Sequence, residues 1–385
     1  MRRQILGLLA ATSLALPVAA NAARNVQTGS AGGLTFKAQS SSVGVDSNAT
    51  TAFGGNPIYL GNTAAYSGVV ALIMDYGAGG SFICSGTLAS DRRSIITAGH
   101  CVSGGAGTPG PLSVTAYFGG GTSPTDRFNG PGTTAIDVSD IFVNPAYTGE
   151  VIDQNDIAVL RLRKYAPDSA MSHDILTVGD LTGFQFNTAG YGARSDGGGN
   201  VGANLGAGRL RQGLNDYDFA LGDSVFGGFF TDADSTGEKF FGTADTTFSY
   251  ISDFDNGLAA NDASCLLATN FDPSAIRFCD LGGGLREVAV AGGDSGGPQF
   301  INGKLASVTS YGLSFGPDFG DVDGDLNSTF GEFSGYVPTF IHADFIRGSL
   351  VAPIPEPATW LQMIFGFGLI GSVLRRRQSA KVAVA

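Results

Sequence analysis

The sequence has little positive charge, few histidines and few cysteines. Its 22 Lys and Arg stand against 34 Asp and Glu, which gives a formal net charge of −12. A chain this acidic repels nucleic acid and anionic lipid, so we expect neither as a partner of its folded part. With three His, four Cys and no Cys-x-x-Cys pair, the chain has no pattern typical of a zinc site. Charged residues make up only 15%, Gly is abundant at 59 and apolar runs are short, which favours an all-β, turn-rich protein.

The first 22 residues have the three parts of a secretory signal peptide. A basic Met-Arg-Arg start precedes an apolar core at 5–16, and Ala-Asn-Ala at 20–22 supplies a small-x-small cleavage pattern. A short buried helix is the alternative, but a basic start followed by Ala-x-Ala suits packing poorly. We therefore predict a signal peptide at 1–22 and export of the rest. Residues 23–57 are rich in Ser, Gly, Ala and Asn, which predicts a flexible leader or propeptide.

The C-terminal segment has a second targeting pattern. Pro355-Glu356-Pro357 precedes an apolar run at 359–374, and Arg375-Arg376-Arg377 follows it. The run is short for a membrane span of about 20 residues, and basic residues follow it as in a stop-transfer signal. The order resembles the PEP-CTERM sorting signal of Gram-negative bacteria, so we assign 351–385 to such a signal. The resemblance implies transient anchoring in the inner membrane through 359–374, processing by a sorting protease, and release or cell-surface attachment. A plain membrane anchor is the alternative.

Four cysteines in an exported chain indicate two disulfides. They form two well-separated local pairs, so the economical pairing is Cys84–Cys101 and Cys265–Cys279. Each bridge closes a short loop and is worth about 3 kcal/mol in the chain-entropy model.

Short β-type runs separated by turn residues follow one another along the chain, at the spacing of a sandwich or barrel. The first series lies at 69–74, 82–88, 94–97, 114–118, 136–143 and 157–162, and the second at 183–191, 226–230, 240–251, 299–301 and 305–311. The two series are joined near 163–180. One helix is predicted at 340–347, where Ile341 and Phe345 are four residues apart. We therefore expect two β units closed by a C-terminal helix.

Three short patterns carry the chemistry. Thr-Ala-Gly-His-Cys at 97–101 ends an apolar strand, Asn-Asp-Ile-Ala-Val-Leu at 155–160 begins another, and Gly-Asp-Ser-Gly-Gly-Pro at 293–298 lies between strands. A lone Asp before a strand is usually a cap and a lone His beside a Cys is usually structural, but the hexapeptide is too tightly specified for a generic turn. A serine hydroxyl needs an imidazole to take its proton and a carboxylate to hold that imidazole in the right tautomer. Glycines beside the serine let backbone N–H groups converge on an oxyanion.

In the order His, Asp, Ser, these patterns resemble the chymotrypsin/trypsin-like serine peptidases, whereas other serine hydrolases order their triads differently. The resemblance covers 58–350 and implies an all-β fold of two antiparallel six-stranded β-barrels with a C-terminal helix. It implies His100 as general base, Asp156 as its orienter and Ser295 as nucleophile. The N–H groups of Gly293 and Ser295 would form the oxyanion hole. The implied activity is endopeptidase hydrolysis of protein or peptide substrates through an acyl-enzyme.

The same resemblance suggests where substrate binds. Ser310-Tyr311-Gly312 resembles the segment that pairs with the substrate backbone, and Ala289, six residues before the serine, takes the place of the pocket floor. An apolar floor cannot compensate a buried cation. We therefore expect cleavage after Ala, Val, Leu or Phe, with Gly312 and Gly335 leaving the pocket walls open. The alternative is an acidic pocket supplied by Asp318, Asp321 or Asp323.

Two features depart from the family pattern. Ala291 stands where the family often has a Cys, so that disulfide is missing. The family's mature N-terminus, Ile-Val-Gly-Gly, pairs its amine with the Asp before the serine. No such sequence is evident here, so the partner of Asp294 and the route of activation stay open.

Two acidic clusters raise the question of calcium. The first places oxygens at positions 1, 3, 5, 7 and 12 of a loop, through Asp321, Asp323, Asp325, Asn327 and Glu332. However, Leu326 stands where an EF-hand needs Gly. Asp253, Asp255 and Asn256 form a looser cluster. Solvated turns are the alternative, since Asp and Asn are ordinary turn residues. We expect no cofactor other than a structural calcium ion at one of these clusters.

Two other functions remain as alternatives to an endopeptidase. One is a peptidase fold that has lost catalysis and serves for binding. The other is a structural component of the extracellular matrix, which the sorting signal and the Gly-rich stretch at 193–208 would suit. Labelling of Ser295 by a fluorophosphonate distinguishes both from a peptidase.

Overall fold

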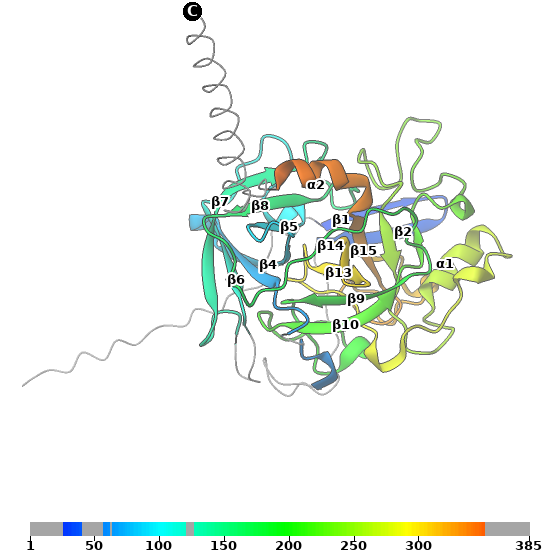
Figure 1. Ribbon diagram of the computed structural model, residues 1–385. Coiled ribbons are helices and arrows are strands. Elements are labelled where there is room, and N and C mark those ends of the chain that lie inside the picture. The colour runs from blue at the N-terminus through cyan, green and yellow to red at the C-terminus, as the bar shows by residue number, and fades with distance from the viewer. Residues whose placement is uncertain (1–25, 41–56, 62–63, 121–126, 351–385) are drawn as a thin grey trace, which may run out of the picture. The chain divides into compact units, whose positions relative to one another are not determined.

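The computed structural model describes residues 26–40, 57–61, 64–120 and 127–350 (Figure 1). The predicted signal peptide and the sorting segment at 351–385 lie outside these residues. No helix of the described part is long and apolar enough to cross a membrane. The segment expected to enter the inner membrane, 359–374, is outside that part as well.

The first β unit is a closed six-stranded antiparallel barrel. Its strands pair in the order β3-β4-β5-β8-β7-β6. They are β3 (Val69–Asp75), β4 (Ser81–Leu88), β5 (Ser94–Thr97), β6 (Ser113–Phe118), β7 (Thr134–Val143) and β8 (Ala158–Leu162). Their Val- and Ile-rich composition suits pleated, buried strands, and Val70, Leu72 and Met74 fill the barrel interior. This barrel matches the prediction closely.

The second β unit is an antiparallel sheet of nine strands rather than the predicted six-stranded barrel. Seven strands pair in the order β10-β9-β13-β14-β15-β12-β11, and β1 and β2 are added beside β14. The seven are β9 (Gln185–Gly190), β10 (Arg211–Asp216), β11 (Phe219–Ala220), β12 (Tyr250–Ser252), β13 (Pro298–Ile301), β14 (Lys304–Ser314) and β15 (Phe333–Pro338). The predicted all-β architecture of two units is confirmed. The second unit differs from the prediction in that it has additional strands.

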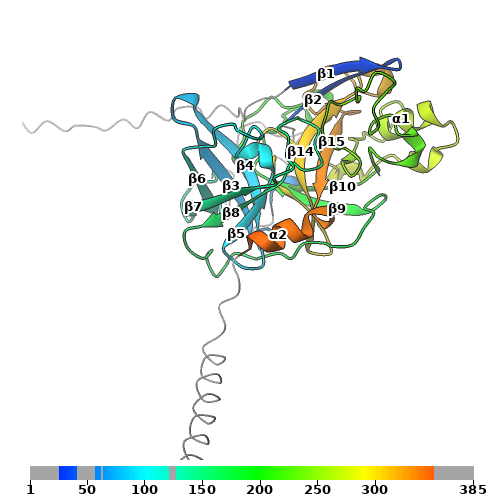
Figure 2. The ribbon, with the colours of Figure 1, turned by 90° about the horizontal axis from the view of Figure 1, so that it is seen from above.

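Two of the extra strands come from the segment expected to be a flexible leader. β1 (Val26–Ala31) and β2 (Leu34–Gln39) form a hairpin, and β2 pairs with Gly312 to Ser314 of β14. Figure 2 shows this hairpin in dark blue near β14. Apolar and polar residues alternate along β2, and its three buried residues, Leu34, Phe36 and Ala38, join the core of the second unit. That period-2 pattern is the signal of a half-buried strand.

The helices are short. α2 (Ala343–Ser349), preceded by the 3₁₀ turn at Phe340–His342, agrees with the predicted C-terminal helix, while α1 (Ala263–Phe271) was not predicted. The other 3₁₀ helices of the described residues are η1 (Pro57–Tyr59), η2 (Gly77–Gly79), η3 (Gly99–Cys101), η4 (Gly198–Asn200), η5 (Ser224–Phe226), η6 (Ile276–Phe278), η7 (Gly284–Arg286) and η8 (Pro317–Phe319). Disulfides join Cys84 to Cys101 and Cys265 to Cys279, as the spacing predicted.

The two β units share a hydrophobic core. One buried cluster contains Val69 and Ile157 from the first unit together with Tyr191, Leu305 and Val308 from the second. Each fully buried aliphatic side chain of this kind contributes about 1.5–3 kcal/mol. The shared core therefore holds the ends of β5 and β8 close to the loop that precedes β13, where the predicted catalytic residues lie.

Candidate active site

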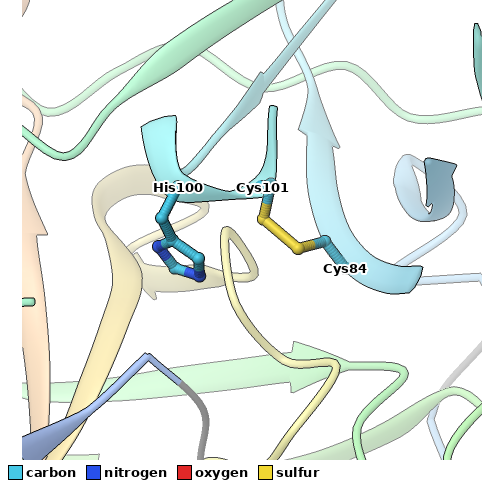
Figure 3. A group of neighbouring side chains, drawn as sticks. All are labelled: Cys84, His100 and Cys101. Atoms are coloured by element: carbon cyan, nitrogen blue, oxygen red, sulfur yellow. A yellow bond between two sulfur atoms is a disulfide. The ribbon is translucent and has the colours of Figure 1, made fainter. Parts of the chain in front are cut away.

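His100 lies in η3, the single turn that follows β5. Ala98, just before this turn, has an extended backbone, and Gly99 and Cys101 are buried. Cys101 is bonded to Cys84 of β4, and Figure 3 shows this disulfide next to the imidazole. The bridge ties the histidine turn to a neighbouring strand of the barrel. Although His100 and the two cysteines cluster closely enough for metal ligation, both sulfurs are in a disulfide, so neither is the thiolate that zinc requires.

Asp156 holds the imidazole of His100 in position. Its side chain is 2% exposed, and its Oδ2 lies 2.7 Å from His100 Nδ1. Its Oδ1 accepts a hydrogen bond of 2.7 Å from the His100 backbone N–H, and the Ser310 hydroxyl donates to Oδ2 at 2.5 Å. A carboxylate with these partners orients the ring so that Nδ1 donates the proton and Nε2 is left as the acceptor.

Ser295 lies in a tight loop that is bound to both β units. Its carbonyl accepts the Ser85 N–H of β4 at 2.8 Å, and the Gly296 N–H donates to Thr309 of β14 at 2.8 Å. Gly296 has φ +76°, and a Cβ there would lie 1.9 Å from Thr97 Oγ1. Glycine is therefore required at this position, because the serine loop passes directly over the end of β5.

The two atoms between which a proton would pass have no hydrogen-bond partner in the described residues. Both Ser295 Oγ and His100 Nε2 are buried, and neither is bonded to a protein group. The structure thus forms the His100–Asp156 pair but not a hydrogen bond between His100 and Ser295. In free enzymes such bonds are often long and shorten only when substrate binds.

Asp294, whose partner the sequence left open, is bonded to backbone amides of its surroundings. Its Oδ1 accepts the Gly192 N–H at 2.7 Å and its Oδ2 accepts the Ala291 N–H at 2.8 Å. Burial raises the pKa of Asp294 to about 6, against the lowering effect of these N–H groups and of Arg211. A Cβ on Gly190 would lie 2.0 Å from the Asp294 carboxylate, and a Cβ on Gly192 would lie 2.1 Å from it. The carboxylate therefore fits only because both positions are glycine.

Comparison with known proteins agrees with this geometry. Residues 59–202 match the trypsin family, and residues 353–378 match the PEP-CTERM protein-sorting motif. The chain carries a trypsin-like serine protease domain. The family match includes His100 and Asp156, while Ser295 lies beyond its end and is brought to them by its contacts with β4 and β14.

Among solved structures, one that is similar is neuropsin, a serine protease expressed in the limbic system of mouse brain. It has a TM-score of 0.47 and 16% sequence identity, and the alignment covers 76% of this chain and 98% of that chain. No curated protein matches the sequence.

The loop of Ser295 in the protease domain has a support that sequence reasoning missed. The Ser85 hydroxyl donates to the Gly293 carbonyl at 2.8 Å and accepts the Tyr191 N–H at 2.9 Å. Ser85 thereby links the glycine of the predicted oxyanion hole to β4. Its position next to Cys84 gave no signal of this role, since both partners are more than 100 residues away in sequence.

The predicted substrate-binding residues are only partly arranged as expected. Ala289 is 3% exposed and packs with Phe254 and Phe330, and it also lines a cavity to which Arg211 and Asp294 contribute. Tyr311 is fully buried, and its hydroxyl is 2.7 Å from Ser249 Oγ. Its ring fills the space beside Gly335, where a Cβ would lie 2.2 Å from the ring. The expectation that Gly335 leaves a pocket wall open was therefore wrong, because this glycine accommodates the tyrosine.

The remaining expected positions have partners within the chain. Gly312 lies opposite Gln39 of β2 in the register of the sheet. The Asp321 carboxylate accepts from the N–H groups of Asp323 and Gly324 and from the Ser314 hydroxyl. These bonds hold Asp321 within its own loop.

Proposed function

We propose that this chain is an exported serine endopeptidase that uses His100, Asp156 and Ser295 to hydrolyse peptide bonds. The observation that carries the proposal is the buried His100–Asp156 pair, in which His100 Nε2, like the Ser295 hydroxyl, has no hydrogen-bond partner among the described residues. The Ser295 carbonyl oxygen lies 3.6 Å from the sulfur of Cys101, the neighbour of His100. His173 also has a buried Nε2 without a partner among the described residues, but its Nδ1 is bonded to the Gly303 carbonyl. Only a carboxylate partner, as in His100, also stabilises an imidazolium.

The reaction follows from these atoms. Ser295 Oγ attacks the carbonyl carbon of the scissile bond while its proton passes to His100 Nε2, and the imidazolium is stabilised by Asp156. The N–H groups of Gly293 and Ser295 stabilise the oxyanion, a contribution typically worth about 10²–10³ in rate per donor. His100 then gives the proton to the leaving amine, which leaves an acyl group on Ser295. Water, deprotonated by His100, hydrolyses this ester and restores the serine.

We further propose that the leader, residues 23–57, acts as a propeptide through β2. An extended peptide substrate binds a peptidase by adding a strand to an exposed sheet edge, and Ser310 to Gly312 is the edge expected for it here. β2 pairs with Gly312 to Ser314, so it competes for one end of that edge. Removal or displacement of β2 would then open the edge to substrate.

We also propose that the sorting segment directs the protein through the inner membrane of a Gram-negative bacterium. A sorting protease would cut near Pro355-Glu356-Pro357, and the product would be attached to the cell surface or released. The match to the PEP-CTERM motif at 353–378 supports this route.

Fluorophosphonate labelling tests the catalytic proposal. We expect Ser295 to be labelled in the wild type, and labelling to be abolished in Ser295→Ala and nearly abolished in His100→Ala. Ser139→Ala on the exposed side of β7 is the matched control and should label like the wild type. A folded wild-type chain that fails to label, with its leader intact or displaced, would favour the binding or matrix functions instead.

The propeptide proposal needs a change that weakens β2 without removing its buried residues. Gln39→Pro removes one backbone N–H from the strand opposite Gly312. The control Ser30→Pro introduces a proline into β1, which pairs with β2 and not with β14. We expect Gln39→Pro to raise the labelling rate above that of Ser30→Pro and the wild type. A synthetic peptide of residues 26–39 should slow it again, and equal rates in all three chains without inhibition by the peptide would exclude β2 as a propeptide strand.

A further inference from the structure

Three carboxylates meet between the end of β12 and the start of α1. One oxygen from each of Asp253, Asp255 and Asp262 lies within 4.8 Å of the others. The three residues are only 4%, 5% and 2% exposed. Asp218 and Glu287, also buried, lie against them: the Asp253 N–H donates to Asp218 at 2.7 Å and the Asp255 N–H donates to Glu287 at 2.6 Å.

Asp255 is the unusual member of this group. Neither of its carboxylate oxygens has a hydrogen-bond partner among the residues that the structure describes, although both are buried. The other two are anchored on the first turn of α1, since Asp253 accepts the Ser264 N–H and Asp262 accepts the Cys265 N–H, each at 2.8 Å. The fold therefore fixes two carboxylates and directs a third, unpaired one toward them. A buried polar group without a partner is costly unless something absent from the protein satisfies it.

The charge around Asp255 is uncompensated. No Lys, Arg or His of the described residues forms an ion pair with any of the five acids. Burial, followed by repulsion from Asp253 and Glu287, raises the pKa of Asp255 to about 10. Burial likewise raises the pKa of Glu287 to about 7. A bound divalent ion would compensate the charge of this group of acids.

We propose that Asp253, Asp255 and Asp262 bind a calcium ion. All three offer hard oxygen ligands, which calcium prefers, and calcium–oxygen distances of about 2.3–2.6 Å allow two ligands of one ion to lie up to about 5 Å apart. The three oxygens lie within 4.8 Å of one another, which is inside that span. A softer metal is disfavoured because the nearest sulfurs, Cys265 and Cys279, are joined in a disulfide. The ion would fix the start of α1 to the end of β12.

The second acidic cluster, which fits the EF-hand spacing better, has no buried carboxylate like that of Asp255; its one buried oxygen without a hydrogen-bond partner among the described residues is the amide Oδ1 of Asn327. Glu332 accepts the N–H groups of Asn327, Ser328 and Thr329, and Asp321 is bonded within its loop. Because these carboxylates already accept N–H groups of their own turn, the second cluster serves as a control for calcium binding at the first. Asp323, an exposed member of it, provides the control substitution.

The test is calcium binding by the full chain in a Ser295→Ala background, which prevents self-cleavage and makes the result independent of catalysis. After metal is removed with a chelator, CaCl₂ is titrated up to about 10 mM, above the roughly 10⁻⁴–10⁻³ M range of extracellular calcium modules. Isothermal titration calorimetry gives the affinity, and thermal unfolding gives the shift in Tm.

We expect calcium to raise Tm in this background and equally in the Asp323→Asn chain. Asp255→Asn should weaken calcium binding by at least about tenfold, yet raise Tm in the absence of calcium, because a neutral amide replaces a buried acid whose charge no cation compensates. A chain that merely failed to fold would not show this rise. The proposal is overturned if calcium leaves Tm unchanged, or if Asp255→Asn binds calcium like the background chain.

Discussion

Gly296 and Gly303 provide a matched pair of substitutions, because both have φ +76° but differ in their surroundings. A Cβ at Gly303 would meet nothing within 4 Å. At Gly296 it would lie 1.9 Å from Thr97 Oγ1 and 2.6 Å from the Ser85 carbonyl oxygen. The left-handed backbone costs an alanine about 1–2 kcal/mol at either position. Crowding in a packed interior adds about 1–3 kcal/mol at Gly296 alone.

We therefore expect Gly303→Ala to lose about 1–2 kcal/mol of unfolding free energy and to keep its activity. Gly296→Ala should lose about 2–5 kcal/mol in total. It should also lose about 10²-fold in activity, because the clash displaces Ser295 from His100 and a shift of about 1 Å has this effect. Urea unfolding measures the first quantity and the rate of fluorophosphonate labelling the second. Equal losses of stability in the two variants, or wild-type labelling in Gly296→Ala, would refute the reasoning.

Three further predictions concern other parts of the chain. The pKa of Asp294 is raised from 3.8 to about 6 by burial, so the fold favours its neutral form. The free energy of unfolding should therefore fall by on the order of 3 kcal/mol as pH rises from about 4 to about 6, relative to the Asp294→Asn chain. Urea unfolding at both pH values measures this change. The same pH dependence of unfolding free energy in both chains would contradict it. The apolar side chain of Ala289 and its contacts with Phe254 and Phe330 predict faster cleavage after Ala, Val, Leu or Phe than after Arg or Lys. A peptide-library profile dominated by cleavage after Arg or Lys would disprove this. Protein recovered from its native host should lack residues 1–22 and everything after Pro355-Glu356-Pro357. Intact-mass measurement tests this, and detection of the arginines at 375–377 on the recovered protein would contradict it.

The parts that could be predicted from sequence are those whose signal is local. The first barrel has strands such as β3 and β5 within a residue of their predicted bounds, because short Val- and Ile-rich runs end at turn residues. The residues of the candidate triad lie in contiguous motifs at 97–101, 155–160 and 293–298, each readable without its neighbours in space. The match of 59–202 to the trypsin family includes the first two of these motifs.

The parts that could not be predicted depend on contacts between distant segments. The predicted strand at 226–230 and most of the one at 240–251 are irregular or turns instead, and only Tyr250 and Ile251 lie in a strand, β12. Gly227, Gly228 and Gly242 have positive φ, which interrupts an extended strand. The pairing of β2 with β14 joins segments more than 270 residues apart. α1 has an Asp262 cap, but its apolar residues do not follow the helical period clearly. Nor does any local pattern reveal that Ser310 donates to Asp156.

The most direct test of the central claim is to trap the acyl-enzyme. The full chain and the Gln39→Pro chain are incubated with an activated ester at acidic pH, where hydrolysis of the ester on the enzyme is slow, and the acylated peptide is located by mass spectrometry. We predict one acyl group on the peptide that contains Ser295, absent from Ser295→Ala and strongly reduced in His100→Ala. An acyl group at another residue, or none in a folded chain with β2 displaced, would contradict the assignment of Ser295 as the nucleophile.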